Sequence, residues 1–404
     1  MTRAMLVLLV SLASLTGLTW APGAIQPQLA APVKVPFELL TRHIVVKGRV
    51  NNSRPLSFVL DTGANLAIVK LDVAKELGLT LYGNVNAGGA GPNRQTGRMV
   101  RNASWTLAGL DGFSQPMTLA LPLVFLAQGL GRNIDGIIGG AFIKAFVVEL
   151  DYQAQQITLH DRKTFRYSGK GETLPLEFTP DGHPIVKALV TAVGGKPIER
   201  RFLLDIGSGA ALILHSPFVA EQRLLASGLN TIRATGSVGA GGQTVGRLGR
   251  VAALQIGTYA INTPIAMFSQ DQAGAFANPA LAGNIGGQIA SRFRTFWDYE
   301  NRRIMLEPSP TFADPFDRAF AGVGLRAEGP DWRSFRVHDL LENSPATEAG
   351  LMKDDVITSV DGVPATSLTL TSLNELLEKP VSLRLTIRRG DHRLDVTLTP
   401  RRLI

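Results

Sequence analysis

The sequence predicts a mainly β protein with two similar halves, followed by a small unit that mixes helices and strands. Two stretches, FVLDTGANLAIV and FLLDIGSGAALIL, each join an apolar strand to an acid, a turn glycine and a second apolar strand. Similar segments follow both stretches in the same order. Short alternating apolar runs and frequent glycine turns fill the rest of the two halves, which favours strands with a few small helices.

The two halves are related by an internal repeat. Three pairs of residues recur at nearly constant spacing: Asp61 and Asp205 at 144, Gly139 and Gly286 at 147, and Asp151 and Asp298 at 147. Self-similarity of this kind indicates a duplicated structural unit. We therefore expect two lobes, at residues 25–165 and 166–310.

The first elements can be placed by their turn and capping residues. Strands are expected in HIVVKGRV and PLSFVL, which meet at an Asn51-Asn52 turn. The run LDVAKELGL reads as a short helix that ends at Gly78. In the second half, SPFVAEQRLL predicts the matching helix, with Ser216 as N-cap and Pro217 at the first helical position.

A glycine-rich stretch follows the helix in each half. These are GNVNAGGAGPNRQTGRM, from Gly83, and ATGSVGAGGQTVGRLG, from Ala234. Neither is a nucleotide-binding pattern. We expect two hairpins, whose glycines let the tips move and approach a ligand closely. The alternative is an ordinary mobile hairpin that contacts no substrate.

The N-terminus has the pattern of a targeting segment. Arg3 precedes a long apolar run, and small residues lie around position 24. Residues 1–24 are therefore predicted to be a secretory signal peptide, with an uncleaved N-terminal anchor as the alternative. No later segment is apolar enough to span a bilayer.

The chain has no cysteine, which excludes disulfides, a thiol nucleophile and cysteine-based metal sites. Together with the signal pattern, this predicts a bacterial protein of the periplasm or a secreted one. The six histidines show no metal-ligand spacing, so we expect neither a metal nor a cofactor.

The net charge of +8 lies outside residues 317–404, which are close to neutral. No basic block with interleaved aromatic residues occurs, so nucleic acid is not an expected partner. A basic exterior can favour a membrane surface or simply aid solubility, and both stay open. We expect a monomer.

These motifs together resemble the pepsin/retropepsin superfamily of aspartic proteases, over residues 35–308. In that family each lobe has an Asp-Thr/Ser-Gly loop and a segment of two hydrophobic residues and a glycine that crosses beneath it. Residues 137–139 (IIG) match the second element, and residues 284–286 (NIG) match it more loosely. The resemblance implies a bilobal aspartic protease with retropepsin-like β lobes and a flap hairpin in each lobe.

The expected chemistry belongs to Asp61 and Asp205. Buried carboxylic acids need a partner, and two held close together share one proton. The ionised acid then activates a water and the protonated acid assists the carbonyl oxygen. Gly63 and Gly207 supply the turn conformation that presents both acids.

Three further residues distinguish the two loops. In the family, Thr62 belongs to a hydrogen-bonded grip between the loops, but Ile206 gives the second loop no hydroxyl for it. Ser208 follows the second glycine, and a hydroxyl that donates to a carboxylate favours its charged form. We therefore expect Asp205 to be the ionised base and Asp61 the proton donor.

Residues 316–404 look like a bacterial PDZ domain. SPATEAGL predicts a capped helix closed by Gly350, and VDGVP predicts a strand with an Asp361-Gly362 turn. A second helix and a closing hairpin follow. The loop with Gly322, Val323, Gly324 and Leu325 occupies the place of the peptide carboxylate-binding loop, so a PDZ peptide ligand is expected.

The sequence thus predicts an aspartic endopeptidase that hydrolyses a peptide or protein substrate, with a PDZ domain for substrate or partner peptides. The alternative is a catalytically weak or inactive peptide-binding scaffold of the same fold, which Ile206 favours. A serine hydrolase is not supported, because no serine lies in a GxSxG elbow.

Overall fold

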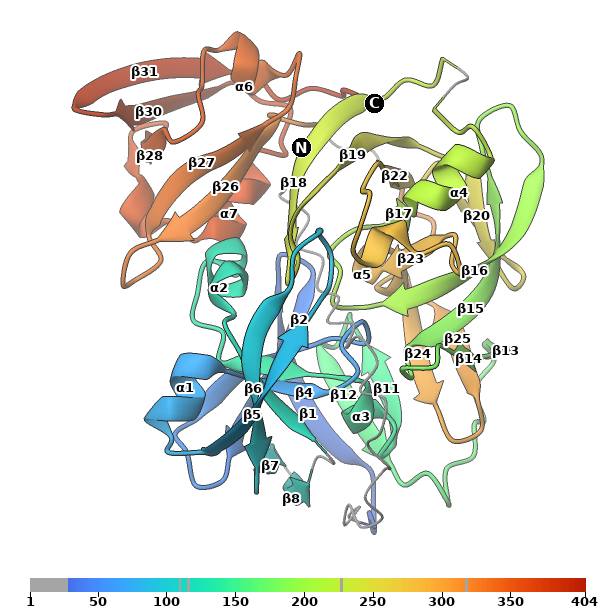
Figure 1. Cartoon of the computed structure of the whole chain (residues 1–404). Helices are drawn as coiled ribbons and strands as arrows, with labels where there is room; N and C mark the ends of the chain where they lie inside the picture. Colours follow the sequence, from blue (N-terminus) through green and yellow to red (C-terminus); the bar gives the residue numbers. More distant parts are fainter. Residues whose placement is uncertain (1–27, 109, 115–116, 226–227, 317–318) are drawn as a thin grey trace.

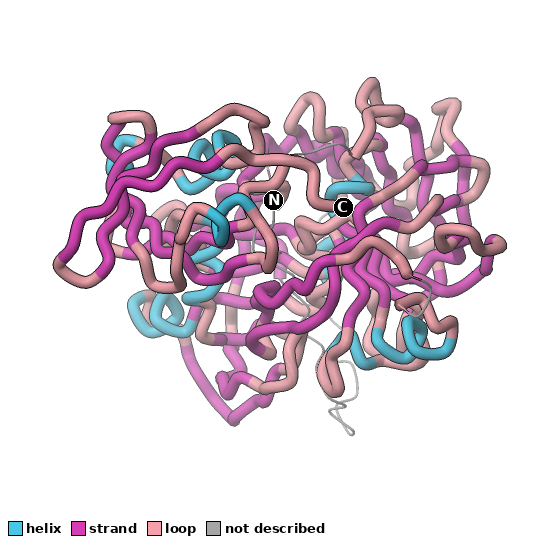
Figure 2. Tube along the Cα trace, turned by 90° about the horizontal axis from the view of Figure 1, so that it is seen from above, coloured by secondary structure: helices cyan, strands magenta, loops and turns pink. Residues whose placement is uncertain are grey.

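The computed structural model describes residues 28–108, 110–114, 117–225, 228–316 and 319–404 (Figure 1). Strands account for 46% and helices for 12% of the structure, so the predicted mainly β class is confirmed. Figure 2 shows the helices as short segments between the strands. The expected leader or anchor at residues 1–24 lies outside the described residues. Within them, no helix has the length and apolar character needed to cross a membrane.

The first lobe is built mainly of strands, and its strand β3 ends just before Asp61. Its elements are β1 (Val33–Leu40), β2 (His43–Val50), β3 (Leu56–Leu60), β4 (Ala67–Lys70), α1 (Leu71–Glu76), β5 (Thr80–Ala87), β6 (Gln95–Arg101), β7 (Ser104–Leu107), β8 (Leu110–Ser114), β9 (Thr118–Leu121), α2 (Val124–Leu130), β10 (Gly136–Ile138), α3 (Gly140–Ile143), β11 (Val147–Asp151) and β12 (Gln156–His160). The predicted turn joins β2 to β3, with Asn51 at a φ of 52°. Gly78 follows α1 at a φ of 63°, as expected for a residue that ends a helix.

The second lobe repeats this order. Its elements are β13 (Glu172–Pro175), β14 (Glu177–Phe178), β15 (Pro184–Thr191), β16 (Pro197–Asp205), β17 (Leu212–Leu214), α4 (Ser216–Glu221), β18 (Ile232–Gly239), β19 (Gly242–Arg250), β20 (Ala253–Ile256), β21 (Tyr259–Asn262), β22 (Ile265–Ser269), η1 (Ala275–Ala277), β23 (Gly283–Gly286), α5 (Gly287–Ala290), β24 (Phe293–Asp298) and β25 (Arg303–Pro308). The predicted N-cap is wrong by one residue: His215 holds that position and Ser216 begins the helix. The Ser216 hydroxyl instead donates to the Asp271 carbonyl (2.6 Å).

The two lobes share one sheet. Strand β11 of the first lobe pairs antiparallel with β24 of the second, so that Val148 lies opposite Trp297. The strand order around this seam is β13-β25-β24-β11-β12-β1, which is symmetric about the β11–β24 pair. Each lobe contributes three strands to it, and Trp297 is fully buried. This pairing fixes how the lobes face each other.

The C-terminal unit is a separate sheet with two helices on it. Its elements are β26 (Val323–Glu328), β27 (Ser334–Leu340), α6 (Pro345–Glu348), β28 (Val356–Val360), β29 (Val363–Pro364), η2 (Ala365–Ser367), α7 (Leu370–Leu376), β30 (Leu383–Arg389) and β31 (His392–Leu398). Ser344 caps α6 through a capping box with Thr347, as the sequence indicates. Asp361 and Gly362 both have positive φ, which confirms the predicted turn.

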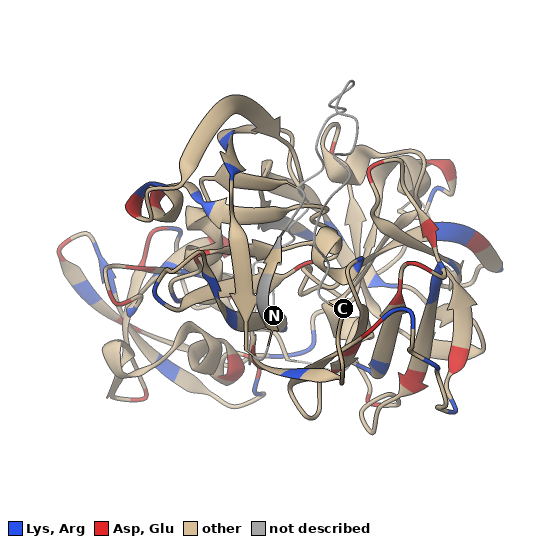
Figure 3. Ribbon diagram, turned by 90° about the horizontal axis from the view of Figure 1, so that it is seen from below, with Lys and Arg blue, Asp and Glu red and all other residues tan. Residues whose placement is uncertain are grey.

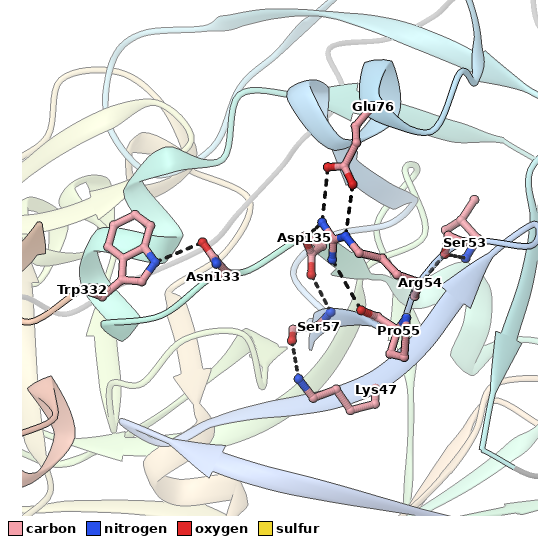
Figure 4. A network of polar contacts seen from close by, with 10 residues as sticks. Lys47, Ser53, Arg54, Pro55, Ser57, Glu76, Asn133, Asp135 and Trp332 are labelled. Atoms are coloured by element: carbon pink, nitrogen blue, oxygen red, sulfur yellow. Dashed lines mark hydrogen bonds and ion pairs between the residues drawn. The ribbon is translucent and has the colours of Figure 1, made fainter. Parts of the chain in front are cut away.

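The C-terminal unit is docked on both lobes. Helix α2 packs against β26, and the Trp332 indole donates to Asn133 just after that helix (3.0 Å; Figure 4). On the second lobe, Glu342 accepts a hydrogen bond from the backbone N–H of Arg233 in β18 (3.0 Å). The C-terminal Ile404 is itself buried in the core of the lobes.

Charged residues of both signs alternate over the ribbon, as seen from below in Figure 3. Many form ion pairs, among them Arg54 with Asp135 (3.2 Å), drawn in Figure 4. Asp135 also accepts the backbone N–H of Ser57 (2.8 Å), which ties the segment before β10 to β3. This contact helps to hold β10 beside β3, the strand that ends just before Asp61.

Candidate active site

Each predicted acid lies at the end of a strand that is paired with a glycine-containing strand. Asp61 follows β3, which runs parallel to β10, and Asp205 ends β16, which runs parallel to β23. All of β3 and the last four residues of β16 are buried, and apart from Asp205 itself nearly all of these residues are apolar, as expected for strands covered on both faces. The two lobes thus present their acids in the same way.

The structure brings Asp61 and Asp205 together. Both carboxyl groups are fully buried and within hydrogen-bonding reach of each other. Gly207 permits this approach, because a β-carbon at that position would lie 2.1 Å from Cγ of Asp61. The backbone N–H of Gly63 donates to Oδ1 of Asp61 (2.7 Å). The predicted glycines therefore lie where the loops meet.

Burial gives the two acids unusual and unequal pKa values. Burial and the nearby charge of Asp205 raise the pKa of Asp61 well above its ordinary value. Burial also raises the pKa of Asp205, to about 7, and hydrogen bonds from Asn284 and two backbone N–H groups keep it from rising further. The proton therefore belongs on Asp61 when the pair holds one.

The donors to Asp205 differ from the expected one. The Asn284 amide donates to Oδ2 of Asp205 (2.9 Å), and the backbone N–H of Ser208 also faces this carboxyl. The Ser208 hydroxyl instead accepts the backbone N–H of Ala210 (3.3 Å). Sequence reasoning missed Asn284. Its only signal was the polar residue in NIG, where the first lobe has an isoleucine.

Thr62 forms one half of the expected grip between the loops. Its hydroxyl donates to the Leu204 carbonyl (2.6 Å) and accepts the backbone N–H of Ile206 (3.0 Å). The Ile206 side chain is buried and cannot return these bonds. The two loops are therefore joined by an asymmetric grip.

A buried histidine from each lobe lies against the Asp-containing loop of the other lobe. His43, the first residue of β2, is so close to Gly209 that a β-carbon there would be 3.0 Å from its Cε1. His183, before β15, neighbours the backbone of Gly63. Burial lowers the pKa of His183, so this ring is neutral when the protein is folded. Neither histidine was singled out from the sequence.

The predicted flaps form hairpins whose tips join the lobes. Strands β5 and β6 pair in the first lobe, and β18 and β19 pair in the second. Between the tips, the backbone N–H of Asn93 donates to Gly241 (2.8 Å), and that of Gly241 donates to Ala90 (2.8 Å). The tip of the first hairpin also accepts the backbone N–H of Ala275 at Gly89 (3.0 Å). Both hairpins are thus held in a closed arrangement.

The predicted peptide-binding loop of the C-terminal domain begins β26. Gly322 has a φ of 80° and contacts Ser344, which leaves no room for a β-carbon; Val323, Gly324 and Leu325 follow in the strand and are buried. Strand β26 is the edge of its sheet, with α7 beside it. Helix α2 packs on β26, and Gly131 contacts Leu370, the first residue of α7. Lobe 1 therefore touches both walls between which a peptide strand would add.

Among the residues that the structure describes, no group of three or more His, Asp or Glu side chains is arranged to hold a metal ion. The site is thus defined by its two carboxyl groups and the neutral groups around them.

Comparisons with known proteins identify two of these regions. Residues 46–142 match the aspartyl protease family and residues 336–389 match the PDZ domain family. The chain thus combines a region that matches aspartyl proteases, which includes Asp61, with a C-terminal PDZ domain.

Two individual proteins are similar over part of their length. A stretch of 65 residues is 34% identical to serine protease HTRA1 of Xenopus laevis and covers 16% of this chain and 14% of that protein. The crystal structure of basic 7S globulin from soybean aligns with 72% of this chain and all of its own, at 11% identity and a TM-score of 0.43.

The grip leads to a prediction on stability. Replacing Thr62 by valine keeps the shape but leaves the buried Ile206 N–H without its acceptor, which costs about 1–3 kcal/mol. We expect Thr62→Val to lower the free energy of unfolding by this amount in urea denaturation. An unchanged value would mean that the grip contributes nothing here.

The converse change tests the missing half of the grip. Ile206→Thr should supply the second hydroxyl and raise the cleavage rate by holding the loops more rigidly. Ile206→Val is the matched control, because it removes the same methylene without adding a hydroxyl. Equal rates for the two variants would contradict this role.

Proposed function

We propose that the protein is an aspartic endopeptidase in which Asp61 and Asp205 are the catalytic residues. The observation that supports this most is the close approach of two fully buried carboxyl groups, one from each lobe, with Asp61 lying against Gly207 beside Asp205. Burying such a pair is costly, and a protein that needed only packing there would be more stable with apolar residues. A shared proton between two acids is the arrangement that activates water for attack on a peptide bond.

The mechanism uses the unequal pKa values of the acids. Asp205, in its ionised form, accepts a proton from a water bound between the carboxyls, and that water attacks the scissile carbonyl carbon. Asp61 donates its proton to the carbonyl oxygen as the tetrahedral intermediate forms. Oδ2 of Asp61 and Oδ1 of Asp205 have no hydrogen-bond partner among the described residues, which leaves one oxygen of each acid for water or substrate.

Substrate access requires a movement, because neither carboxyl is exposed. The flap tips are the segments best suited to open, since only backbone hydrogen bonds join Ala90 and Asn93 to Gly241. The extended backbone released from these bonds can then pair with a peptide substrate. Opening is therefore part of the proposed catalytic cycle.

The PDZ domain is proposed to bind a substrate or partner peptide and to control this opening. Glu342 contacts β18 through Arg233 and lies 3.8 Å from Arg247 of β19, so the domain holds the flap of the second lobe. Because α2 of lobe 1 packs on β26 and the following Gly131 contacts α7, a peptide that adds along β26 competes with this docking. Peptide binding and flap release are thereby linked.

A non-catalytic peptide-binding scaffold is the second candidate, and the observation that favours it is Ile206. One half of the grip is missing, which loosens a geometry that catalysis needs. In this case the protein would bind peptides between its lobes without hydrolysing them.

The dyad is tested by changing each acid separately. Asp61→Asn and Asp205→Asn should each reduce peptide cleavage by about a thousandfold or more, since an amide can neither accept the water proton nor donate one to the carbonyl. Cleavage of a peptide library by the wild type and both variants measures this. Peptide binding without cleavage in all three proteins would support the scaffold instead.

The pH dependence follows from the raised pKa values. Asp205 must be ionised and has a pKa of about 7, so the acid limb of the rate–pH profile should have its midpoint near pH 7. Asp61 must keep its proton in the active form, and its strongly raised pKa favours this, so activity should persist at neutral pH. Steady-state rates from pH 3 to 9 check this prediction, and a maximum in strong acid would contradict it.

Folding stability should depend on the same groups. Their folded-state pKa values lie above the ordinary carboxyl value, so their contribution to stability is present in acid and is lost as pH rises through about 7. The loss runs from the ordinary carboxyl pKa, about 4, up to about 7, so Asp205→Asn should flatten the loss of stability over this range. Thermal unfolding of both proteins across this range measures the effect.

Release of the PDZ domain gives a further prediction. Glu342→Ala should raise the cleavage rate roughly two- to fivefold, because an exposed ion pair and one hydrogen bond are worth at most about 1 kcal/mol. Glu348→Ala is the control, since Glu348 pairs with Arg401 within the same region, away from the flap. Equal rates for both variants would argue against control of the flap.

The proposed setting is the bacterial periplasm or the exterior, with the protein monomeric and either free or held at a membrane surface by its N-terminal segment. Fractionation of cells that express the full chain, with and without residues 1–24, tests this localisation.

A further inference from the structure

A chain of three buried side chains leads away from Asp205. The Asn284 amide donates to Oδ2 of Asp205, and its carbonyl oxygen lies 2.9 Å from Nε2 of His215. The other ring nitrogen of His215 lies 3.2 Å from the backbone carbonyl of Asn278. The side chains of Asp205, His215 and Asn284 are each at most 1% exposed. Such a polar chain in a core is costly unless every group in it is satisfied.

The first lobe has nothing equivalent. Ile137 pairs with β4 as Asn284 pairs with β17, so these two positions correspond. Lys70 corresponds to His215, because their backbone N–H groups donate to the carbonyls just before β10 and β23. The buried Ile137 shows that the fold accepts an apolar residue at this place. The polar chain in the second lobe is therefore not a requirement of the fold.

The orientation of the chain depends on the charge of Asp205. An ionised carboxylate only accepts hydrogen bonds, so it must face the NH₂ group of Asn284. The amide oxygen of Asn284 then faces Nε2 of His215, which has to be the protonated nitrogen of the ring. In this state the amide stabilises the negative charge of Asp205, while Nδ1 of His215 faces the Asn278 carbonyl without a proton. When Asp205 is protonated, the amide can turn and the ring can carry its proton on Nδ1 instead, so the tautomer of His215 follows the charge of Asp205.

We propose that Asn284 and His215 are positioning residues that make Asp205, rather than Asp61, the ionised base of the dyad. This inference rests on the proposed function for its catalytic meaning. Burial lowers the pKa of His215, which agrees with a neutral ring that acts through its hydrogen bonds. Three other ionisable side chains near the pair lie outside this chain: Tyr299, which interacts with Asp61, and His43 and His183, which lie against the two loops.

The first experiment measures rate–pH profiles of the wild type and four variants. Asn284→Ile copies the residue of the first lobe and should move the acid limb upward by about one to two pH units, because the carboxylate loses a donor. His215→Leu should do the same. His215→Gln keeps an N–H donor and should restore the wild-type limb, and Ser216→Ala, beside the chain, should leave it unchanged.

A purely structural role would lower the rate at every pH without moving the midpoint of the acid limb. This result in folded Asn284→Ile would overturn the proposal. The same midpoint of the acid limb in His215→Leu and His215→Gln would also overturn it. Circular dichroism and thermal unfolding confirm that each variant is folded before its profile is compared.

The second experiment does not depend on activity. Histidine-selective ¹⁵N spectra distinguish which ring nitrogen is protonated, and the His215 signal is assigned by its loss in His215→Gln. We expect the Nε2–H form in the wild type at neutral pH, with a change near pH 7 that is absent in Asp205→Asn. A ring protonated only at Nδ1, with no change over this range, would refute the chain. If the wild type cleaves no peptide but shows this titration, the proposed function fails while the proton arrangement stands.

Discussion

The repulsion between two carboxylates buried side by side is the constraint on which the rest of the site depends. Neither Asp61 nor Asp205 can reach solvent, so one of them keeps a proton and the other needs donors. Three features keep the two carboxyl groups close together. They are the close contact at Gly207, the hydrogen bonds of Thr62 and the strands beneath each loop. If the loops separated, both acids would return to ordinary behaviour and the shared proton would be lost.

The pseudo-symmetry of the molecule holds for the backbone but not for the chemistry. The strands, helices and hairpins repeat between the lobes, whereas the side chains around the two acids differ. Asp205 accepts a hydrogen bond from the amide of Asn284, while the corresponding position of the first lobe holds the apolar Ile137. The hydroxyl grip is likewise present on one side only. A duplicated fold can thus hold two identical groups in different protonation states, because each half has diverged around its own acid.

Much of the fold could be predicted because it depends on local patterns and on the repeat. The turn at Asn51, the cap at Ser344 and the pairing of the two acids all follow from residues near one another or from matched spacing. The role of Asn284 could not be found in this way, since its contact with Asp205 depends on the register of two parallel strands that are 79 residues apart in sequence. The docking of the PDZ domain, with Trp332 on Asn133, joins residues 199 apart and leaves no local signal.

The seam between β11 and β24 has a consequence for the separate halves. If the chain were divided between β12 and β13, each piece would be left with a long unpaired strand edge whose natural complement is the other piece. Because the seam is symmetric, such an edge could also pair with the same edge of a second copy. Expressed alone, a single lobe would therefore be expected to associate with itself or to aggregate, and covalent fusion of the lobes ensures that unlike halves meet.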